Sequence, residues 1–289
     1  MSKIKLENIK YVYGEGTPFE KEALNNVNLE FEEGVITGLI GHTGCGKSTL
    51  VQLLNGLLKP TSGKVILNGT DIWEKPKEIG QVRFKVGLVF QYPEYQLFAE
   101  TVYKDIAFGP ENMGLDTEDI AQRVGEAAKF VGIDENLFEK SPFELSGGQK
   151  RRVAIAGVMA MAPEVIILDE PAAGLDPMGR EDILGGIRSY QREKKCTVII
   201  VSHSMEDMAR YADKLVVMKK GQVFLAGSCY EIFAHSDELK SVGLDVPQIT
   251  VFMSELKARG FDVKTDIFTI EQAREELLRF VRERGVKQC

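Results

Sequence analysis

The spacing of hydrophobic and polar residues predicts both strands and helices along the chain. Ile4 and Leu6, and later Val27, Leu29 and Phe31, alternate with polar residues, which is typical of strands with one buried face. Short and mostly apolar runs follow, and these favour strands that are buried on both faces. The runs lie at 35–40, 64–67, 86–90, 165–168, 197–201 and 214–218.

The stretches between these strands carry helical periodicity. After the strand at 35–40 and a glycine-rich segment, one apolar helical face is formed by Leu50, Leu53, Leu54 and Leu57. We expect the Lys-Pro-Thr-Ser-Gly segment at 59–63 to end this helix. The pattern from about 93 to 160 predicts an inserted helical subdomain. Strands separated by helices indicate an α/β fold around a parallel sheet.

The composition changes after about residue 230, where two more helices are predicted. The apolar face of the first is formed by Ile249, Phe252, Met253 and Leu256, with Gly260 as its end. The second begins at Thr269, which is spaced for a capping box with Gln272. Its apolar face is formed by Ile270, Ala273, Leu277 and Val281, with Gly285 as its end. We therefore divide the chain into a main domain, 1–230, and an extension, 231–289, that either packs on the main domain or serves as a dimerisation element.

The composition is that of a soluble globular protein. The 289 residues are 44% hydrophobic and 27% charged, with a net charge of −7. This acidic balance argues against a general nucleic-acid binder, so no nucleic-acid partner is expected. No apolar run approaches the ~18–20 residues of a membrane helix. The four cysteines form no C-x-x-C pair, which fits a reducing compartment. We expect the protein to stay in the cytoplasm and to meet a membrane only through a partner.

The segment after the strand at 35–40 carries the clearest chemical pattern, because it fits the phosphate-binding loop G-x-x-x-x-G-K-[ST]. The predicted nucleotide-binding residues are Gly41, His42, Thr43, Gly44, Cys45, Gly46, Lys47, Ser48 and Thr49. Glycines let backbone N–H groups surround phosphates at the positive end of the following helix. Lys47 would reach the β- and γ-phosphates, and the Ser48 hydroxyl would hold Mg²⁺. His42 would contribute only its backbone. The Cys45 thiol would react readily in an empty site unless the packing of the loop hides it.

A second candidate site follows the apolar run at 165–168. Asp169 and Glu170 stand at the carboxyl end of that strand, where α/β sheets bind ligands. Asp169 suits the coordination of Mg²⁺, and Glu170 suits the orientation and deprotonation of an attacking water. Together with the phosphate-binding loop, the pair predicts a site that hydrolyses a nucleotide.

Leu-Ser-Gly-Gly-Gln at 145–149 resembles the signature of ATP-binding cassette (ABC) ATPases, and further motifs follow in the family's order over about 3–230. Gln91 matches the glutamine loop, which senses Mg²⁺ and the γ-phosphate. Asp176 matches the loop after the catalytic glutamate, and His203 matches the switch histidine. Tyr13 matches the ring that stacks on adenine, with Tyr11 as its competitor. The resemblance implies a nucleotide-binding domain with an antiparallel β subdomain, with ATP and Mg²⁺ as cofactors and with Lys47, Gln91, Glu170 and His203 as catalytic residues.

The resemblance also implies a head-to-tail dimer. Each ATP would lie between the phosphate-binding loop of one subunit and the signature segment of the other. The γ-phosphate would there be held by the signature residues Ser146, Gly147, Gly148 and Gln149.

The sequence resembles the ATPases of energy-coupling factor (ECF) transporters in two segments, 91–98 and 105–110. It resembles the second of the two paralogues in that family at 16–20 and 169–177. Such transporters import vitamins or transition-metal ions. The resemblance implies three partners: a paralogous ATPase in a heterodimer, a membrane coupling protein and a substrate-binding membrane protein. The alternative is a soluble ABC ATPase acting on nucleic acid or the ribosome. The chain, however, shows neither sustained heptads nor a second copy of the motifs.

Overall fold

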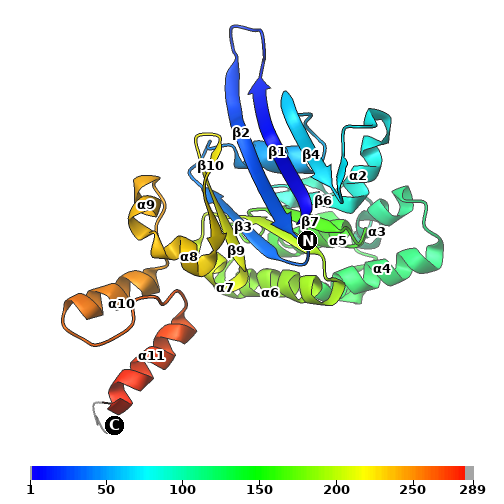
Figure 1. Ribbon diagram of the computed structural model, residues 1–289. Helices are drawn as coiled ribbons and strands as arrows, with labels where there is room; N and C mark the ends of the chain where they lie inside the picture. Colours follow the sequence, from blue (N-terminus) through cyan, green and yellow to red (C-terminus); the bar gives the residue numbers. More distant parts are fainter. Residues whose placement is uncertain (1, 284–289) are drawn as a thin grey trace.

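Two stacked sheets and a layer of helices make up most of the molecule, as the computed structural model shows for residues 2–283 (Figure 1). The smaller sheet is antiparallel and has the order β2-β1-β4-β5. Its strands are β1 (Ser2–Tyr13), β2 (Lys21–Glu32), β4 (Ser62–Leu67) and β5 (Thr70–Asp71). The larger sheet has the order β10-β9-β3-β8-β7-β6. Its strands are β3 (Ile36–Gly41), β6 (Val86–Val89), β7 (Val165–Asp169), β8 (Thr197–Val201), β9 (Lys214–Lys219) and β10 (Gln222–Ser228).

The larger sheet is parallel from β9 to β6 and is covered on both faces. Along β7, Val165 and Ile167 point into the core shared with the small sheet, while Ile166 and Leu168 point into the helical core. Both faces exclude water, so these strands are continuous apolar runs rather than alternating patterns. This confirms the strands predicted at 165–168, 197–201 and 214–218 and the parallel α/β fold.

The helices lie mainly on the side of the large sheet that faces away from the small one. They are α3 (Val102–Asn112), α4 (Thr117–Phe130), α5 (Gly147–Met159), α6 (Pro177–Lys194), α7 (Met205–Tyr211), α8 (Cys229–Ala234) and α9 (Ser236–Ser241). Helix α2 (Ile79–Lys85) packs through Ile79 and Val82 on the core of the small sheet. Short 3-10 turns are η1 (Pro76–Glu78), η2 (Pro93–Gln96), η3 (Glu135–Leu137) and η4 (Pro142–Glu144). Helix α1 (Lys47–Leu54) instead shares a core with both sheets. In the part of the chain that the structure describes, no helix is long and apolar enough to span a membrane.

Helix α1 is shorter than its sequence pattern predicts. It ends at Leu54, and Leu57 lies outside it with a 40% exposed side chain. Gly56 follows the end of the helix in the left-handed region, with φ of 71°. The buried Asn55 side chain donates to the Val86 carbonyl, so the end of α1 is fixed to strand β6.

Strand β10 was not predicted from the sequence. A two-residue turn joins it to β9, and both turn residues, Lys220 and Gly221, have positive φ. Two positive φ values are typical of the type I′ turns that join adjacent antiparallel strands. The glycine at this position was the signal in the sequence, but β10 is an edge strand with little buried surface and lacks a strong apolar pattern.

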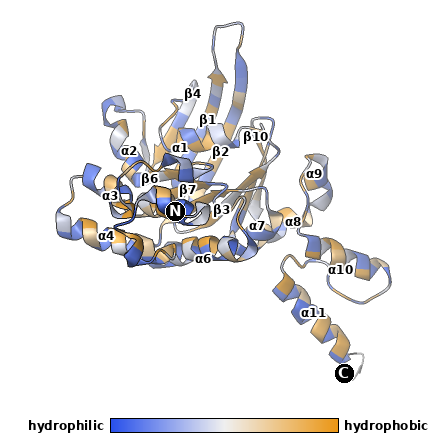
Figure 2. Ribbon diagram, turned by 180° about the vertical axis from the view of Figure 1, so that it is seen from behind, coloured by the Kyte–Doolittle hydropathy of each residue, from blue (hydrophilic) through white to orange (hydrophobic). Residues whose placement is uncertain are grey.

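The carboxy-terminal helices α10 (Gln248–Ala258) and α11 (Ile270–Glu283) project away from the sheets (Figure 1). Figure 2 shows hydrophobic and hydrophilic residues interleaved along α11. The predicted capping box is present, because Thr269 and Gln272 each accept a backbone N–H from the other. The two helices have a small core of their own, built on Met253, Val263, Ile267 and Ala273. The extension also packs on the main domain, because Leu239, Leu244, Val246 and Phe268 belong to the core of the large sheet and its helices. Phe268 contacts the rings of Tyr230 and Phe233 there. A role of the extension in dimerisation stays a prediction. The predicted helix end at Gly285 lies outside the described residues.

Glu276→Gln should destabilise this helical pair near neutral pH and remove part of its acid sensitivity. The Arg279 guanidinium, together with the Lys264 N–H, lowers the pKa of Glu276 from 4.5 to about 2. Because the pKa is lowered, the stabilisation is present above about pH 4.5 and is lost as the pH falls toward 2. Hydrogen exchange of residues 248–283, corrected for the intrinsic rate, measures the stability of the pair.

The matched control is Glu275→Gln, which changes an exposed carboxylate on the same helix. We expect wild-type protection for the control at every pH. Equal loss of protection in both variants at pH 7 would contradict the role of Glu276.

Candidate active site

The loop between β3 and α1 has the shape that its glycines predict. Gly46 precedes α1 with φ of 108°, and a Cβ there would lie 2.8 Å from the Ala23 carbonyl oxygen. At Gly41, a Cβ would lie 2.6 Å from the Met218 oxygen. Only glycine fits at these two points, because neighbouring strands come so close to the loop. The loop is therefore held closely against β2 and β9.

Lys47 lies across this loop. Its Nζ donates to the carbonyl oxygens of Gly41, at 2.5 Å, and His42, at 3.2 Å. Its Nζ also donates to Cys45 Sγ at 3.7 Å. None of these three contacts supplies a counter-ion to the ammonium, which makes this a favourable place for a phosphate group.

Asp169 is buried at the carboxyl end of β7 and forms a hydrogen bond with Ser48. Burial raises the pKa of the Asp169 carboxyl, and the neighbouring Glu170 charge raises it further, while Lys47 and Ser48 oppose the shift. A buried carboxylate beside a second one favours a bound cation. Asp169, Ser48 and Gln91 present the oxygen ligands that Mg²⁺ prefers, and phosphate oxygens and water usually complete its shell.

Glu170 and His203 come together from two neighbouring strands. Glu170 directly follows β7 with φ of 52°, a strained conformation for a non-glycine residue, and its N–H donates to the Val201 oxygen. The His203 Nδ1 lies 2.8 Å from Glu170 Oε1, where an Nδ1–H donates to the carboxylate. The Glu170 side chain is 13% exposed and that of His203 is 77% exposed. A carboxylate held in this way can orient a water and accept its proton.

These residues line a single cavity of about 370 Å³ at the carboxyl ends of the parallel strands. The predicted residues that line it are Tyr13, Gly41, Thr43, Gly44, Gly46, Lys47, Ser48, Thr49, Gln91, Asp169, Glu170 and His203. Tyr13 is the better placed of the two candidate rings, because its hydroxyl lies 3.1 Å from Thr49 Oγ1. Tyr11 packs edge-on against Tyr13 and contacts the core.

Four residues of the cavity, Lys21, Glu22, Ala23 and Val201, were not predicted as site residues. Val201 is the last residue of β8, which was predicted only as a strand. The other three lie on β2 and reach the loop through the pairing of β2 with β1, where Tyr13 is opposite Lys21. Nothing in their local sequence indicates this contact.

The loop residues His42 and Cys45 do not line this cavity. The His42 ring bonds the Thr43 carbonyl at 2.7 Å and faces a larger cavity of about 770 Å³, beside Gly243 and Leu244. Its backbone carbonyl accepts from Lys47 Nζ, and a contact of the His42 backbone with nucleotide stays a prediction. The Cys45 side chain is buried at 5% exposure. The packing of the loop hides it, so the expected ready reaction of its thiol is not supported.

Two of the predicted motifs lie away from this cavity. Ser146 caps helix α5 and forms a capping box with Gln149, while Gly147 begins the helix. Asp176 caps helix α6 by accepting the Gly179 N–H at 2.7 Å. Ser146 and Gly147 are exposed, so the signature faces solvent rather than the chain's own phosphate-binding loop.

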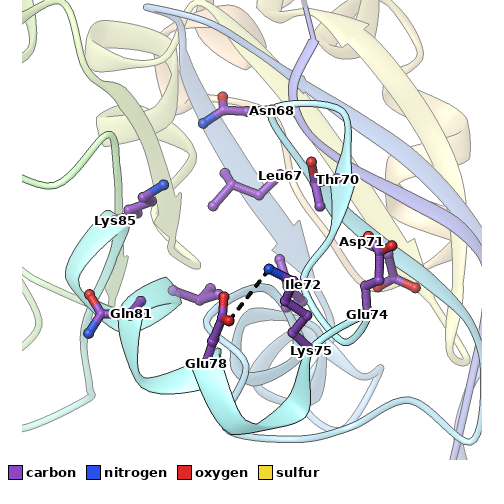
Figure 3. Close-up of a pocket in the computed structure, with 11 residues that line it drawn as sticks. Leu67, Asn68, Thr70, Asp71, Ile72, Glu74, Lys75, Glu78, Gln81 and Lys85 are labelled. Atoms are coloured by element: carbon purple, nitrogen blue, oxygen red, sulfur yellow. Dashed lines mark ion pairs between the residues drawn. The ribbon is translucent and has the colours of Figure 1, made fainter.

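A further cavity of about 270 Å³ lies between the β4–β5 turn and helix α2 (Figure 3). Acidic and basic side chains share its wall, including the Lys75–Glu78 ion pair at 3.5 Å. None of the predicted site residues lines this cavity, so it is distinct from the candidate active site.

Comparison with known proteins identifies the family. The model of the ABC transporter family matches residues 24–173. The energy-coupling factor transporter ATP-binding protein EcfA2 of Clostridium acetobutylicum is 58% identical over 277 residues, which are 96% of this chain and 97% of that protein. EcfA2 of Caldanaerobacter subterraneus is 54% identical over 279 residues, 96% of this chain and 98% of that protein.

Solved structures agree with the sequence relatives. The structure of cbiO1 from Clostridium perfringens, described as part of the ABC transporter complex cbiONQ, has a TM-score of 0.75 and 42% identity over 88% of this chain and 99% of that chain. A dimeric ATP-binding cassette in a post-hydrolysis state, bound to ADP and Pi, has a TM-score of 0.70 and 30% identity over 78% of this chain and 98% of its own. This chain therefore belongs to the ABC transporter family, among the ATP-binding proteins of energy-coupling factor transporters.

Proposed function

We propose that this chain binds and hydrolyses ATP to power an energy-coupling factor importer for a vitamin or a transition-metal ion. The observation that carries this proposal is the meeting of Lys47, Asp169, Glu170 and His203 in one cavity, in a chain 58% identical to an EcfA2 protein. The relatives are named as transporter proteins, and this favours transport over an action on nucleic acid or the ribosome.

ATP would lie along the loop at 41–46, with its base near the Tyr13 ring. Lys47 would exchange its bonds to the Gly41 and His42 carbonyls for bonds to the β- and γ-phosphates. This exchange costs little because neutral acceptors are replaced by charged ones.

Ser48 and Asp169 would hold Mg²⁺, with Gln91 nearby. The ion would neutralise charge that develops on the phosphates during transfer. Asp169 fits this role because its carboxylate is buried, shares a hydrogen bond with Ser48 and lies beside the second carboxylate of Glu170.

Glu170 would orient the attacking water and accept one of its protons as the water oxygen bonds to the γ-phosphorus. The bond from that phosphorus to the β–γ bridging oxygen breaks, giving ADP and phosphate. His203 would hold the Glu170 carboxylate through the contact at 2.8 Å. A fixed carboxylate needs no rearrangement at the moment of reaction.

A second ATPase subunit would complete the site. The exposed Ser146 and Gly147 lie at the start of α5, where a hydroxyl and free N–H groups can bind a γ-phosphate on the opposite subunit. We propose a heterodimer with a paralogous ATPase, in which 1–230 is the ABC ATPase domain and 231–289 contributes to the dimer contact. The extension exposes apolar side chains that would support this contact, namely Val251, Phe252, Phe261 and Ile270.

An aromatic surface patch, defined here as Tyr92, Tyr95, Phe98 and Phe108, would receive the membrane coupling protein. Tyr95 is 85% exposed and Phe98 is 61% exposed, and the Phe98 and Phe108 rings meet edge-on at 4.8 Å. Exposed aromatic residues are typical anchors for a partner helix. The patch follows Gln91 directly, so that the partner and the nucleotide would act on one segment. A substrate-binding membrane protein would complete the assembly at the cytoplasmic face of the membrane.

His203→Ala should lower the turnover number for ATP by roughly 10²-fold, within the range for loss of general-base function. The variant loses the contact that holds the Glu170 carboxylate, while the loop that binds ATP is unchanged. Steady-state hydrolysis and an ATP-binding titration measure the two effects. His235→Ala is the control, because His235 pairs only with Glu238 at the surface among the described contacts. Equal losses in both variants would contradict the assignment.

Glu170→Gln should bind ATP and accumulate as a closed dimer, because the general base is lost and hydrolysis falls by ~10²–10⁴-fold. Sedimentation with Mg-ATP, with and without the paralogue, measures dimer formation. We expect a dimer only with the paralogue. The Glu170→Gln, Lys47→Ala double variant is the control, since weak ATP binding should prevent the dimer. A tight dimer of this chain alone, unchanged by the paralogue, would contradict the heterodimer.

Tyr95→Glu should abolish uptake into proteoliposomes by the full complex and leave much of the basal ATP hydrolysis. The ring is 85% exposed, so a charge there disturbs a partner more than the fold. Phe19→Glu is the control, because Phe19 is 88% exposed on the β1–β2 turn. A matching loss of uptake and hydrolysis with a lower melting temperature would show instead that Tyr95 supports the fold.

A further inference from the structure

A buried arginine joins three segments of the site. Arg151 lies on helix α5 and is 4% exposed. Its Nε and Nη2 donate to the two carboxylate oxygens of Glu94, at 3.1 and 2.8 Å. Its Nη1 donates to the carbonyl oxygen of Ala173. The guanidinium therefore holds a carboxylate on one side and a backbone carbonyl on the other.

The three segments are parts of the catalytic machinery described above. Glu94 is in η2, three residues after Gln91 and next to Tyr95 of the aromatic patch. Ala173 is three residues after Glu170 and donates its N–H to the Glu170 carbonyl at 3.2 Å. Arg151 itself is five residues after Ser146 of the signature. One side chain thus connects the partner-facing segment, the signature helix and the loop behind the catalytic carboxylate.

A buried ion pair is seldom a source of net stability. Removing two charges from water costs about as much as their attraction returns, and apolar replacements are often neutral or stabilising. The Glu94 side chain is 17% exposed and that of Arg151 is 5% exposed, so the pair meets this condition. The pair instead fixes the relative position of its partners, because the planar guanidinium holds the Glu94 carboxylate and the Ala173 carbonyl in one geometry.

The next residue on the helix has different contacts. Arg152 donates to the Val131 carbonyl and to Asp182, so it ties α5 to α4 and α6. Those contacts support packing between helices. Arg151, in contrast, reaches the loops that carry Gln91 and Glu170.

We propose that Arg151 is a positioning residue that fixes the Gln91–Glu94 segment and the Glu170–Asp176 loop against the signature helix. Through Arg151, docking of the partner at Tyr95 then affects the position of Glu170, and the position of Glu170 affects the docking surface. The inference rests on the proposed transport function. It assigns to Glu94 an internal partner, so this carboxylate is committed to Arg151 and is not left to bind the membrane protein.

The test uses the complete transporter with its paralogue and membrane proteins in proteoliposomes. Arg151→Met should leave the ATP dissociation constant within about twofold and lower kcat by on the order of 10- to 100-fold, since small misplacements of reacting groups have effects of this size. Uptake per ATP hydrolysed should also fall. Arg151→Lys keeps the charge but loses the fork, and it should give intermediate values.

A double variant separates positioning from packing. Arg151→Met, Glu94→Met removes the unpaired charge and should restore the melting temperature that Arg151→Met alone lowers. It should not restore kcat or the uptake per ATP, because no group then reaches Ala173. Lys194→Met is the control for the loss of an interhelix ion pair, here with Glu126 at 2.6 Å, and should match wild type in kcat.

Two results would overturn the inference. One is a double variant that regains kcat together with its melting temperature, and the other is a folded Arg151→Met protein with wild-type kcat and uptake per ATP. A wild-type complex that takes up no substrate would instead contradict the proposed transport function. In that case the kcat values of the same variants still decide whether Arg151 positions Glu170.

Discussion

The site depends on the register of the parallel strands β3, β8 and β7. Leu39 on β3 is paired with Val201 on β8, and Val201 is paired with Asp169 on β7. Parallel strands end at the same edge of a sheet, so the residues that follow them meet there. Burial of both faces fixes this register, because a slip by one residue would move every side chain of the strand from one core into the other. The apolar packing of the strands thus sets the distance between the phosphate-binding loop, Glu170 and His203.

Electrostatics then makes this edge of the sheet receptive to a cation and a phosphate. Burial raises the pKa of Asp169, and the charge of the adjacent Glu170 adds to the effect, so the Asp169 carboxylate stands where water stabilises it poorly. The positive charge of Lys47, on the phosphate-binding loop, stabilises the negative charge of Asp169. The same cavity therefore presents oxygen ligands suited to Mg²⁺ next to an ammonium suited to a phosphate, and in the proposed function ATP would join the two. Neither charge is stabilised by the fold alone, and the fold instead holds them ready for the ligand.

The motifs and the buried strands could be predicted because each is a local pattern. Four apolar residues before Asp169 predict a strand, and glycines at fixed spacing before Lys47 predict the loop. What could not be predicted depends on contacts between distant segments. The end of α1 depends on Asn55 reaching Val86, and the burial of Cys45 depends on how the loop packs. The place of Lys21 in the cavity depends on strand pairing, and the separate core of α10 and α11 depends on the loop at 261–268. The Arg151–Glu94 pair spans 57 residues and leaves no periodic signal.

Helix α5 carries two features close together near its start, an exposed capping box and a buried arginine. At its start, the capping box satisfies the backbone N–H groups of Ser146 and Gln149, and Ser146 and Gly147 are exposed. One turn later, Arg151 points inward to Glu94 and Ala173. A phosphate bound on the outward side by another subunit would pull on the same helix that positions the chain's own Glu170. In the proposed dimer, phosphate binding across the interface and hydrolysis within each subunit would therefore be coupled through this one helix, without any need for a long-range change in the sheets.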